Sequence, residues 1–312
     1  TGKGAETRQK RGTEYIDTPS DVDYVQSFLQ EYDVRHGLDG MEKVRSLLSI
    51  LPILKRDEGR TVVVKYGGSA LGAEAATDTT LQDVAALRMV GVRVVLVHGG
   101  GKHITALLDK LQVPTRFENG YRYTDQAVLE TAEMALSAQV NKAIVSRLSQ
   151  LEVSAVGLSG KDGGLLTAVE KDPALGRVGS ITRVEPRILQ TLLDGDFLPV
   201  VSPIAAGEDG GGFNCNADDA ARAVAAALGA DKLIFLTDSH NSKTAVPHMD
   251  VKRAEELIDT GLIAGGMVPK VRGCIQAIRA GVGEVSILDG RVEHALLLEM
   301  LNQRVQGTTI TG

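Results

Sequence analysis

The sequence has no tryptophan, two cysteines and six histidines among 312 residues. Cys215 and Cys274 are too few for a disulfide framework, which favours a reducing compartment. Neither His98 nor His103 has a cysteine or histidine at ligand spacing, so we predict no metal site built from protein ligands. No run of about 18 apolar residues predicts a membrane span. No apolar segment follows the first basic residues, as a secretory signal would require.

Excess positive charge is also missing, because 34 lysines and arginines face 40 acidic residues and the net charge is −6. This balance argues against a nucleic-acid-binding surface. The hydrophobic fraction of 43% excludes a disordered chain, and the length is sufficient for two lobes with a sizeable core. We expect a cytoplasmic protein that binds neither nucleic acid nor membrane. Because the chain begins with threonine, a trimmed plastid protein of the stroma would look the same.

The first sixty residues differ in texture from the rest. Residues 1–18 are polar and predict a solvated tail, whereas 21–36 and 41–51 carry apolar residues at helical spacing. Pro52 is expected to kink or end the second of these helices. We therefore assign residues 1–60 to a polar tail and N-terminal helices.

After residue 60, short β-branched runs alternate with amphipathic stretches. The predicted strands are 61–64, 92–97, 154–158, 198–201, 233–236 and 285–288. The predicted helices are 80–90, 103–112, 126–150, 186–194, 217–228, 253–260, 270–280 and 294–301. This alternation predicts an α/β fold in which helices sandwich an open, mainly parallel sheet, with an N-terminal helical extension. Residues 207–212 (GEDGGG) look like a hairpin tip, and 167–182 predict another antiparallel pair.

Glycine runs follow two predicted strands, as Gly67-Gly68 and as Gly99-Gly100-Gly101. Successive glycines admit a phosphate close to the backbone N–H groups, and the N-terminus of a following helix favours negative charge. A glycine run is a tight turn at least as often, so the runs alone leave both interpretations open. The sequence lacks the G-x-x-x-x-G-K-[ST] P-loop, the H-R-D and D-F-G of protein kinases and a strand-following G-x-G-x-x-G.

Charged residues stand beside these glycines. Lys65 ends a strand before the first run, where it is either a surface lysine or a point charge on a phosphoryl group. Lys270 follows a glycine pair and precedes a helix. Asp218 follows Asn216 into a helix, which simple N-capping by Asn216 also explains. Asp238 ends a strand, where it either contacts ribose or phosphate-bound Mg²⁺ or starts a turn.

Arg122 lies in a segment rich in turn-forming residues, ENGYRYTD (118–125). An arginine fork holds a carboxylate through two parallel hydrogen bonds. An isolated loop arginine is more often merely solvated, so the position alone does not decide its role.

Taken together, these residues resemble the amino-acid kinase family. The motifs are VVVKYGGSAL (62–71), VLVHGGG (95–101), ENGYRYTD (118–125), GLSGKDGGLL (157–166), NCNADDAA (214–221), KLIFLTD (232–238), GGMVPKVRGC (265–274) and ILDGRVEHALLLE (287–299). The later motifs are similar to those of the N-acetylglutamate kinase branch and separate the chain from aspartokinases, whose C-terminal regulatory domains it also lacks.

The resemblance implies phosphoryl transfer from ATP, with its bound Mg²⁺, to the side-chain carboxylate of N-acetyl-L-glutamate. The product is N-acetyl-L-glutamyl 5-phosphate, an intermediate of arginine biosynthesis. The implied catalytic residues are Lys65, Lys270 and Asp218. Those implied for acceptor binding are Gly100, Gly101, Arg122 and Asn214, and those implied for the nucleotide are Gly68, Asp238, Gly266 and Met267.

The same resemblance implies an organisation in lobes. Residues 61–195 would bind the acyl amino acid and dimerise, and 196–312 would bind the nucleotide. The N-terminal helix and the C-terminal DGRVEHALLLE resemble arginine-inhibited members of the family, in which an N-terminal helix exchanges between dimers to build a hexamer. His294 and Glu299 match positions that line the arginine site there. The alternative is a dimer in which residues 41–54 pack on their own subunit.

Departures from the family pattern keep other functions open. The segment after Asp238 is shorter and more polar than usual, and Tyr121 and Tyr123 flank Arg122 where leucine and valine are commoner. One alternative is a kinase for a related N-acyl amino acid, such as an acyl aminoadipate or another acylglutamate. Another is a weakened relative that acts as an arginine-sensing subunit.

Overall fold

The structure is a computed structural model that describes residues 40–67, 79–237, 248–301 and 307–312. Contacts divide the chain into two units, Thr1–Pro52 and Ile53–Gly312. The helix predicted at 21–36 lies outside the described residues. Pro52 lies inside helix α2 (Gly40–Arg56). The helix therefore continues past the proline and does not end at it, which was one of the two predicted outcomes. A proline in a helix costs about 3 kcal/mol, but that cost is local and four further residues stay helical.

The main sheet has eight strands in the described part of the chain, in the order β12-β14-β13-β11-β1-β2-β8-β5. All pairs from β13 to β5 are parallel, and β14 runs antiparallel to β13. The strands are β1 (Thr61–Tyr66), β2 (Arg93–His98), β5 (Ala155–Ser159), β8 (Leu198–Ser202), β11 (Lys232–Thr237), β12 (His248–Asp250), β13 (Glu284–Asp289) and β14 (Gly307–Thr311). The predicted open, mainly parallel sheet is confirmed.

Helices occur wherever the sequence predicted them after residue 60. They are α3 (Thr79–Met89), α4 (Gly101–Leu111), α5 (Gln126–Glu133), the π-helix η3 (Met134–Val140), α6 (Asn141–Gln150), α7 (Arg187–Asp194), α8 (Ala217–Leu228), α9 (Val251–Asp259), α10 (Met267–Arg279) and α11 (Ala295–Met300). Two short 3₁₀ turns are η4 (Asp162–Gly164) and η5 (Pro173–Leu175). The predicted helix 126–150 is continuous but contains the π segment η3. None of the described helices is both long and apolar enough to cross a membrane.

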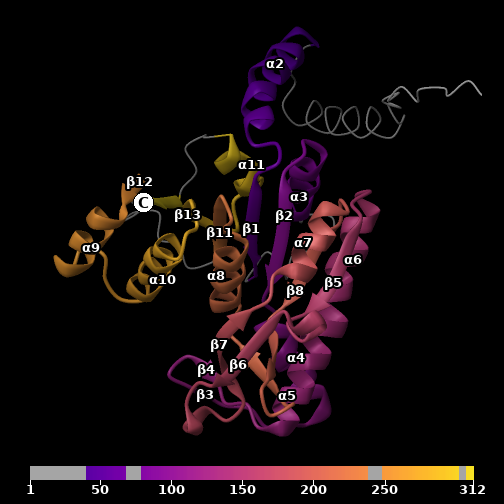
Figure 1. Cartoon of the computed structure of the whole chain (residues 1–312), viewed down its shortest axis with the longest axis vertical. Coiled ribbons are helices and arrows are strands. Elements are labelled where there is room, and N and C mark those ends of the chain that lie inside the picture. Colours follow the sequence, from indigo (N-terminus) through magenta and orange to yellow (C-terminus); the bar gives the residue numbers. More distant parts are fainter. Residues whose placement is uncertain (1–39, 68–78, 238–247, 302–306) are drawn as a thin grey trace, which may run out of the picture. The chain divides into compact units, whose positions relative to one another are not determined.

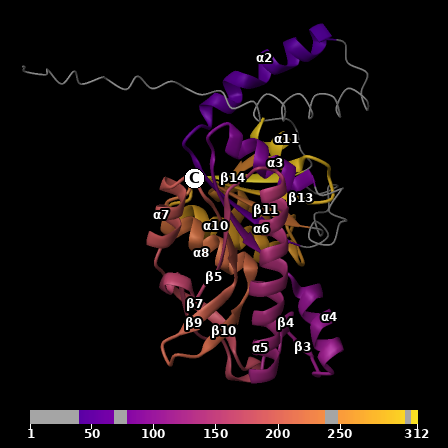
Figure 2. The ribbon, with the colours of Figure 1, turned by 90° about the vertical axis from the view of Figure 1, so that its right-hand side faces the viewer.

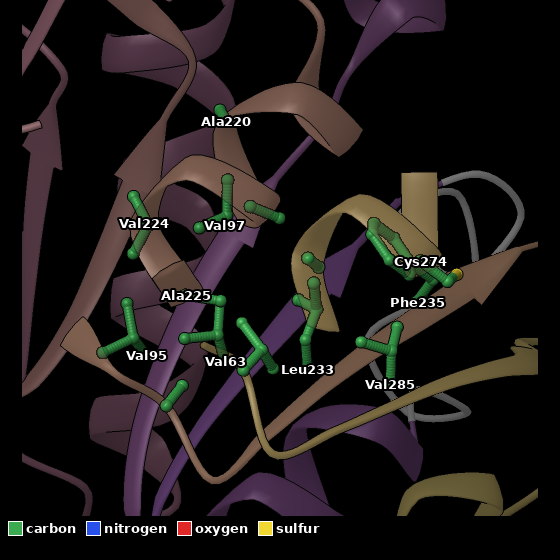
Figure 3. Close-up of a cluster of buried hydrophobic side chains, with 14 of the residues drawn as sticks. Val63, Val95, Val97, Ala220, Val224, Ala225, Leu233, Phe235, Cys274 and Val285 are labelled. Atoms are coloured by element: carbon green, nitrogen blue, oxygen red, sulfur yellow. The ribbon is translucent and has the colours of Figure 1, made fainter. Parts of the chain in front are cut away.

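Helices cover both faces of the main sheet (Figures 1 and 2). Successive residues of a strand point to opposite faces, and on β1 Val63 packs with side chains of α7, α8 and α10, whereas Val62 and Val64 pack with α3, α6 and α11. Figure 3 shows the first of these clusters, where Val63 and its strand neighbours face α8 and Cys274 of α10. Burial on both faces explains why the strands appear in the sequence as unbroken apolar runs.

A smaller β unit lies beyond one end of the main sheet (Figure 1). Four strands close into a ring in the order β10-β7-β6-β9. They are β6 (Leu166–Glu170), β7 (Val178–Val184), β9 (Ile204–Gly207) and β10 (Gly212–Cys215). The antiparallel pairs β6–β7 and β9–β10 confirm both predicted hairpins. A separate hairpin joins β3 (Phe117–Glu118) to β4 (Tyr121–Arg122). Both cysteines are free and buried, as the prediction without disulfides requires.

Candidate active site

A cavity of about 430 Å³ opens where the central parallel strands end. Lys65 is the penultimate residue of β1, and Thr237 is the last residue of β11. Ligands of open α/β sheets sit at this carboxyl edge, because the strands lead there into loops and helix N-termini. The residues lining the cavity are Lys65, Tyr121, Lys171, Asn216, Asp218, Asp219, Arg222, Phe235, Leu236, Thr237, Gly266, Pro269, Lys270, Gly273 and Ile287.

Lys65 and Asp218 form an ion pair in this cavity. Nζ of Lys65 lies 3.0 Å from Oδ1 of Asp218, and their side chains are 15% and 40% exposed. Asn216 caps helix α8 by accepting hydrogen bonds from the N–H groups of Asp218 and Asp219 at 2.8 and 3.3 Å. The cap predicted for Asn216 is therefore confirmed, and it fixes the backbone from which Asp218 reaches Lys65.

In the first glycine run, position 67 favours glycine for a steric reason. A Cβ placed on Gly67 would lie 2.9 Å from Nζ of Lys65 and 3.8 Å from the backbone nitrogen of Gly99. Any side chain at this position would push on the lysine ammonium. The second residue of the run, Gly68, lies outside the described residues.

Lys270 lines the same cavity and belongs to another element, α10. It lies in the first turn of α10, and its Nζ donates a hydrogen bond to Oγ1 of Thr237 at 2.7 Å. Gly266, which precedes α10, also lines the cavity. Met267 does not line it and packs against the apolar core. The structure thus brings Lys65, Asp218, Lys270 and Gly266 to one cavity, while Asp238 lies outside the described residues.

The second glycine run, residues 99–101, leads from β2 into the first residue of α4, and we call it the glycine loop. Gly100 has a φ of 153°, and a Cβ there would lie 2.6 Å from Cδ2 of Leu136, so the position requires glycine. A Cβ on Gly99 would lie 3.9 Å from that of Ala217, at the start of α8. No side chain caps α4 at Gly100. The first N–H groups of α4 have no acceptor within the helix, and such N–H groups at a helix N-terminus stabilise an anion.

Arg122 is fixed against the glycine loop. The side chain is 7% exposed, and its NH2 donates to the carbonyl of Gly101 at 3.0 Å and to Oγ1 of Thr105 at 2.8 Å. Its NH1 donates to Oγ1 of Thr115 at 2.9 Å, and the guanidinium lies 4.6 Å from the centre of the Phe117 ring. Burial lowers the pKa of Arg122 from its usual value. These hydrogen-bonding partners are all uncharged, and the nearby charge of Asp109 only partly opposes the effect of burial on the pKa of Arg122. A ligand carboxylate would add a direct ion pair.

Asn214 approaches from the small β ring. It lies on β10, and its Nδ2 donates to Oγ1 of Thr124 at 3.4 Å, two residues beyond Arg122. The next residues lead through Asn216 into α8 and Asp218. The hairpin bearing Arg122 and the strand bearing Asn214 are therefore adjacent, as acceptor binding by both would require.

The sequence reasoning did not identify Lys171 as a cavity residue. Its Nζ lies 3.9 Å from Oδ2 of Asp219 and 4.9 Å from the centre of the Tyr121 ring. Asp219 is also paired with Arg222, one turn further along α8. The i,i+3 spacing of Asp219 and Arg222 in a helix predicts an ion pair from the sequence. A single lysine in a turn after β6 has no such pattern, so its place in the cavity could not be predicted.

His294 and Glu299 do not line the cavity. Nδ1 of His294 lies 2.6 Å from Oδ1 of the fully buried Asp83 on α3. Oε1 of Glu299 accepts hydrogen bonds from Nζ of Lys232 at 2.8 Å and from Oγ of Ser286 at 2.6 Å.

Comparison with known proteins gives the family. The model of the amino acid kinase family matches residues 60–289. An acetylglutamate kinase of a Nostoc species is 44% identical over 278 residues, covering 86% of this chain and 94% of its own. One of a Ruegeria species is 45% identical over 276 residues, with coverages of 87% and 96%. The chain therefore belongs to the amino acid kinase family.

The similarity extends to solved structures. N-acetylglutamate synthase from Neisseria gonorrhoeae, complexed with coenzyme A and N-acetyl-glutamate, superimposes with a TM-score of 0.74 at 24% identity. The match covers 86% of this chain but 63% of the synthase, so the chain spans less than two thirds of that protein. At this identity the likeness concerns the fold.

Proposed function

We infer that the chain transfers the γ-phosphoryl group of ATP to the side-chain carboxylate of N-acetyl-L-glutamate, giving N-acetyl-L-glutamyl 5-phosphate and ADP in arginine biosynthesis. The relatives named acetylglutamate kinase are 44% and 45% identical over most of both chains. The observation that carries the proposal is the convergence of Lys270 and the Lys65–Asp218 pair on one cavity beside the glycine loop. The relatives favour this acceptor over an acyl aminoadipate and favour an enzyme over a sensing subunit.

In this proposal the two lysines flank the phosphoryl group. Lys65 and Lys270 supply fixed positive charge from β1 and α10, and Asp218 orients Lys65 through their 3.0 Å contact. A carboxylate acceptor is already anionic, so the reaction needs no strong base. One oxygen of the acceptor bonds to the γ-phosphorus while the bond from that phosphorus to the ADP oxygen breaks. The main barrier is bringing anions together in line, which fixed cations and backbone amides lower.

The acceptor occupies the side of the cavity next to the glycine loop. We assign the N–H groups of Gly100 and Gly101 to acceptor and transferring oxygens, and Arg122 with Asn214 to the free carboxylate and acetamide. The uncharged partners of Arg122 leave its positive charge for that carboxylate.

The nucleotide occupies the opposite side. We assign it to the region of Gly266 and Met267, together with Gly68 and Asp238 outside the described residues. Gly266 lines the cavity, whereas Met267 would contribute through its backbone at the start of α10, because its side chain packs in the core. Mg²⁺ belongs to the substrate and enters bound to the ATP phosphates, so no protein ligand is assigned to it.

The test is trapping of the acyl phosphate. The full chain is incubated with MgATP, N-acetyl-L-glutamate and hydroxylamine, and the hydroxamate is measured. We expect a signal that requires both substrates and disappears when unacetylated glutamate replaces the acceptor. A signal from N-acetyl-aminoadipate that exceeds the one from N-acetyl-L-glutamate would contradict the proposed acceptor. No signal from folded protein with any acceptor would contradict the enzyme.

We further propose that α2 joins copies of the chain into a homo-oligomer, a hexamer in which dimers exchange this helix. Val44, Leu47, Leu48 and Leu51 recur at helical spacing on α2 and are 47%, 39%, 62% and 45% exposed. An apolar stripe of this kind is typical of an interaction face. Light scattering of Leu48→Glu should show a smaller assembly, whereas Ser46→Glu, which adds the same charge away from the stripe, should not. Equal assembly of both variants would contradict the role of α2.

We propose arginine as the effector of this assembly, at a site that includes His294 and Glu299. The expected result is inhibition of turnover by millimolar arginine in the wild type and a higher inhibitory concentration in His294→Asn. Turnover that arginine leaves unchanged would contradict this proposal. The lobe boundary at residues 195/196 and a location in cytoplasm or plastid stroma stay predictions.

A further inference from the structure

His98 is a wholly buried histidine directly before the glycine loop, and the proposed reaction does not use it. Its Nδ1 lies 2.8 Å from the carbonyl oxygen of Gly99, and its Nε2 lies 3.2 Å from Nδ2 of Asn141. A carbonyl only accepts hydrogen bonds and an amide NH₂ only donates them. Both contacts are therefore satisfied by the neutral ring with its proton on Nδ1.

The ring stays neutral at physiological pH. Burial lowers the pKa of His98 to about 4, and the nearby charges of His103 and Lys142 act in the same direction. The hydrogen bond to Gly99 opposes them. His98 is thus a fixed hydrogen-bonding group and not a proton carrier.

Asn141 holds the far side of the His98 ring and is itself wholly buried. Its Nδ2 lies 2.9 Å from the carbonyl oxygen of Val200 and 3.3 Å from that of Leu158, and its Oδ1 accepts from Nζ of Lys142 at 3.1 Å. A Cβ on Gly157 would lie 1.9 Å from Oδ1 of Asn141, so this site requires glycine. Asn141 therefore ties His98 to the neighbouring strands β5 and β8.

The π-helix η3 brings Asn141 and the glycine loop together. The N–H of Asn141 donates to the carbonyl of Leu136, five residues earlier, which is the π register. Side chains of the same segment pack on the loop, because a Cβ on Gly100 would lie 2.6 Å from Leu136 and 3.4 Å from Val140. One segment thus sets both the polar anchor of His98 and the apolar floor beneath Gly100.

Peptide planarity converts the His98 contact into an orientation of a neighbouring amide. The carbonyl of Gly99 and the N–H of Gly100 belong to one planar trans peptide and point in opposite directions. Holding the carbonyl of Gly99 on Nδ1 of His98 therefore fixes the direction of the N–H of Gly100. The next carbonyls are held as well, that of Gly100 by the N–H of Ile104 at 3.0 Å and that of Gly101 by Arg122.

We propose that His98 is a positioning residue, which through the carbonyl of Gly99 and the side chain of Asn141 orients the N–H of Gly100 toward the transferring phosphoryl oxygens. The inference rests on the proposed function of the same site, because the direction of the Gly100 N–H matters for turnover only if that N–H binds a phosphoryl oxygen. A histidine that served only the fold would not need one particular ring nitrogen to meet the loop.

Two substitutions separate the two ring contacts. His98→Asn can place an NH₂ donor near the position of Nδ1, and it loses the bond to Asn141. His98→Gln can place an acceptor near the position of Nε2, and it loses the donor to Gly99. A displacement near 1 Å costs about 100-fold in rate. We expect kcat of His98→Gln to fall about 100-fold with both KM values within threefold, and kcat of His98→Asn to fall less than tenfold.

The pH profile distinguishes positioning from proton transfer. His98→Gln should show the same dependence of kcat on pH between 6 and 9 as the wild type, at a lower level throughout. Ser286→Ala is the control, because Ser286 is also wholly buried and hydrogen-bonded but contacts Glu299 away from the cavity. It should lose thermal stability without losing kcat.

Three results would overturn the proposal: a His98→Gln variant with kcat within twofold of the wild type, equal losses in the two variants, or a changed pH profile. If neither variant folds, ¹⁵N-histidine NMR of the wild type decides. The proposal requires the Nδ1–H tautomer at His98, and the Nε2–H tautomer or a protonated ring would overturn it. The wild-type hydroxamate assay tests the proposed function separately, so an active wild type with an active His98→Gln variant removes this inference alone.

Discussion

Two lysine–carboxylate clusters lie on the neighbouring strands β1 and β11, and their surroundings differ. Lys65 is paired across the sheet with Phe235, and Lys232 with Val62, so the two lysines are three residues apart along the strands, about 10 Å. Lys65 meets one half-exposed carboxylate beside a cavity. Lys232 is 7% exposed, and its Nζ lies 2.6 Å from Glu284 and 2.8 Å from Glu299.

One oxygen of the Glu299 carboxylate is held from within the chain. The same oxygen, Oε1, accepts from Lys232, from Oγ of Ser286 at 2.6 Å and from Oγ1 of Thr309 at 3.2 Å. Burial by itself raises the pKa of Glu299, but the ammonium of Lys232 and these hydrogen bonds outweigh it and hold the pKa below its usual value. A cluster that satisfies its own charges stabilises the fold, whereas the Lys65–Asp218 pair faces space that a ligand can occupy.

The largest expected effect is on stability, and it comes from disrupting the buried cluster of Lys232, Glu284 and Glu299. Lys232→Met removes the ammonium that Glu284 and Glu299 share. Removing one partner of a buried ion pair typically costs about 3–5 kcal/mol of unfolding free energy, and the partial exposure of Glu284 favours the lower value. Urea unfolding measures this loss. Turnover of the folded fraction should equal that of the wild type, and a reduced turnover would contradict the structural role.

The pH dependence of that loss has a definite sign. A carboxyl group whose pKa is lowered in the fold stabilises the protein above its unfolded pKa, about 4.3, and this contribution disappears as the pH falls through the folded value. The stability difference between the wild type and Lys232→Met should therefore be full at pH 7 and shrink below pH 4. A difference that stays constant into acid would show that packing, not charge, is lost.

Substitutions of the lysines that line the cavity should have the reverse effect, a loss of turnover with little loss of stability. Lys65→Met and Lys270→Met each remove one fixed positive charge from the phosphoryl group, by analogy with loss of an oxyanion-hole donor at about 3–4 kcal/mol of barrier. Turnover should fall more than 100-fold in each. The unfolding free energy should change by less than about 1 kcal/mol, because Lys65 pairs with a half-exposed carboxylate. Near-normal turnover in a folded variant would remove that lysine from the mechanism.

The sequence predicted the main sheet well, because strands buried on both faces form unbroken apolar runs. The boundaries erred where polar residues belong to a strand. The apolar run 61–64 is shorter than β1, and the prediction that Lys65 ends the strand misses Tyr66, whose backbone still pairs with β2. The edge strands β12 and β14 and the π register of η3 were not predicted. A π segment changes the hydrogen bonding of a helix without changing its apolar composition.

The site was predictable where the motifs are local. Lys65, Asp218 and Lys270 lie next to glycine runs or a helix start, and the structure brings all three to one cavity. Lys171 and Tyr121 were not predicted as its lining, since they reach it only when the small β ring and the β3–β4 hairpin come together beside α8. Such contacts depend on tertiary packing and leave no pattern in the sequence. The orientation of His98 depends in the same way on Asn141, 43 residues further along.

The next smaller effect is expected from a substitution of Arg122, which contacts the glycine loop. Arg122→Lys keeps the charge but cannot make the hydrogen bonds to Thr115, Thr105 and the carbonyl of Gly101 together. We expect the KM for N-acetyl-L-glutamate to rise about tenfold, equivalent to 1.4 kcal/mol, with the KM for ATP unchanged. Arg116→Lys is the matched control, since this arginine of the same hairpin is 59% exposed. A rise in both KM values would show that Arg122 supports the whole site.

The smallest expected effect concerns Lys171, which belongs to neither cluster by its contacts alone. Its ion pair with Asp219 is long, 3.9 Å, and its side chain is 28% exposed, so unlike Lys232 it is not saturated by carboxylates. If it acts with Lys65 on anionic substrate, Lys171→Met should lower kcat/KM about fivefold, equivalent to about 1 kcal/mol, and leave unfolding unchanged. Tyr121→Phe keeps the ring beneath the ammonium and should match the wild type, whereas Tyr121→Leu should resemble Lys171→Met. A Lys171→Met variant that loses stability but keeps kcat/KM would place Lys171 with Lys232, because only a charge facing the substrate changes the rate without changing the fold.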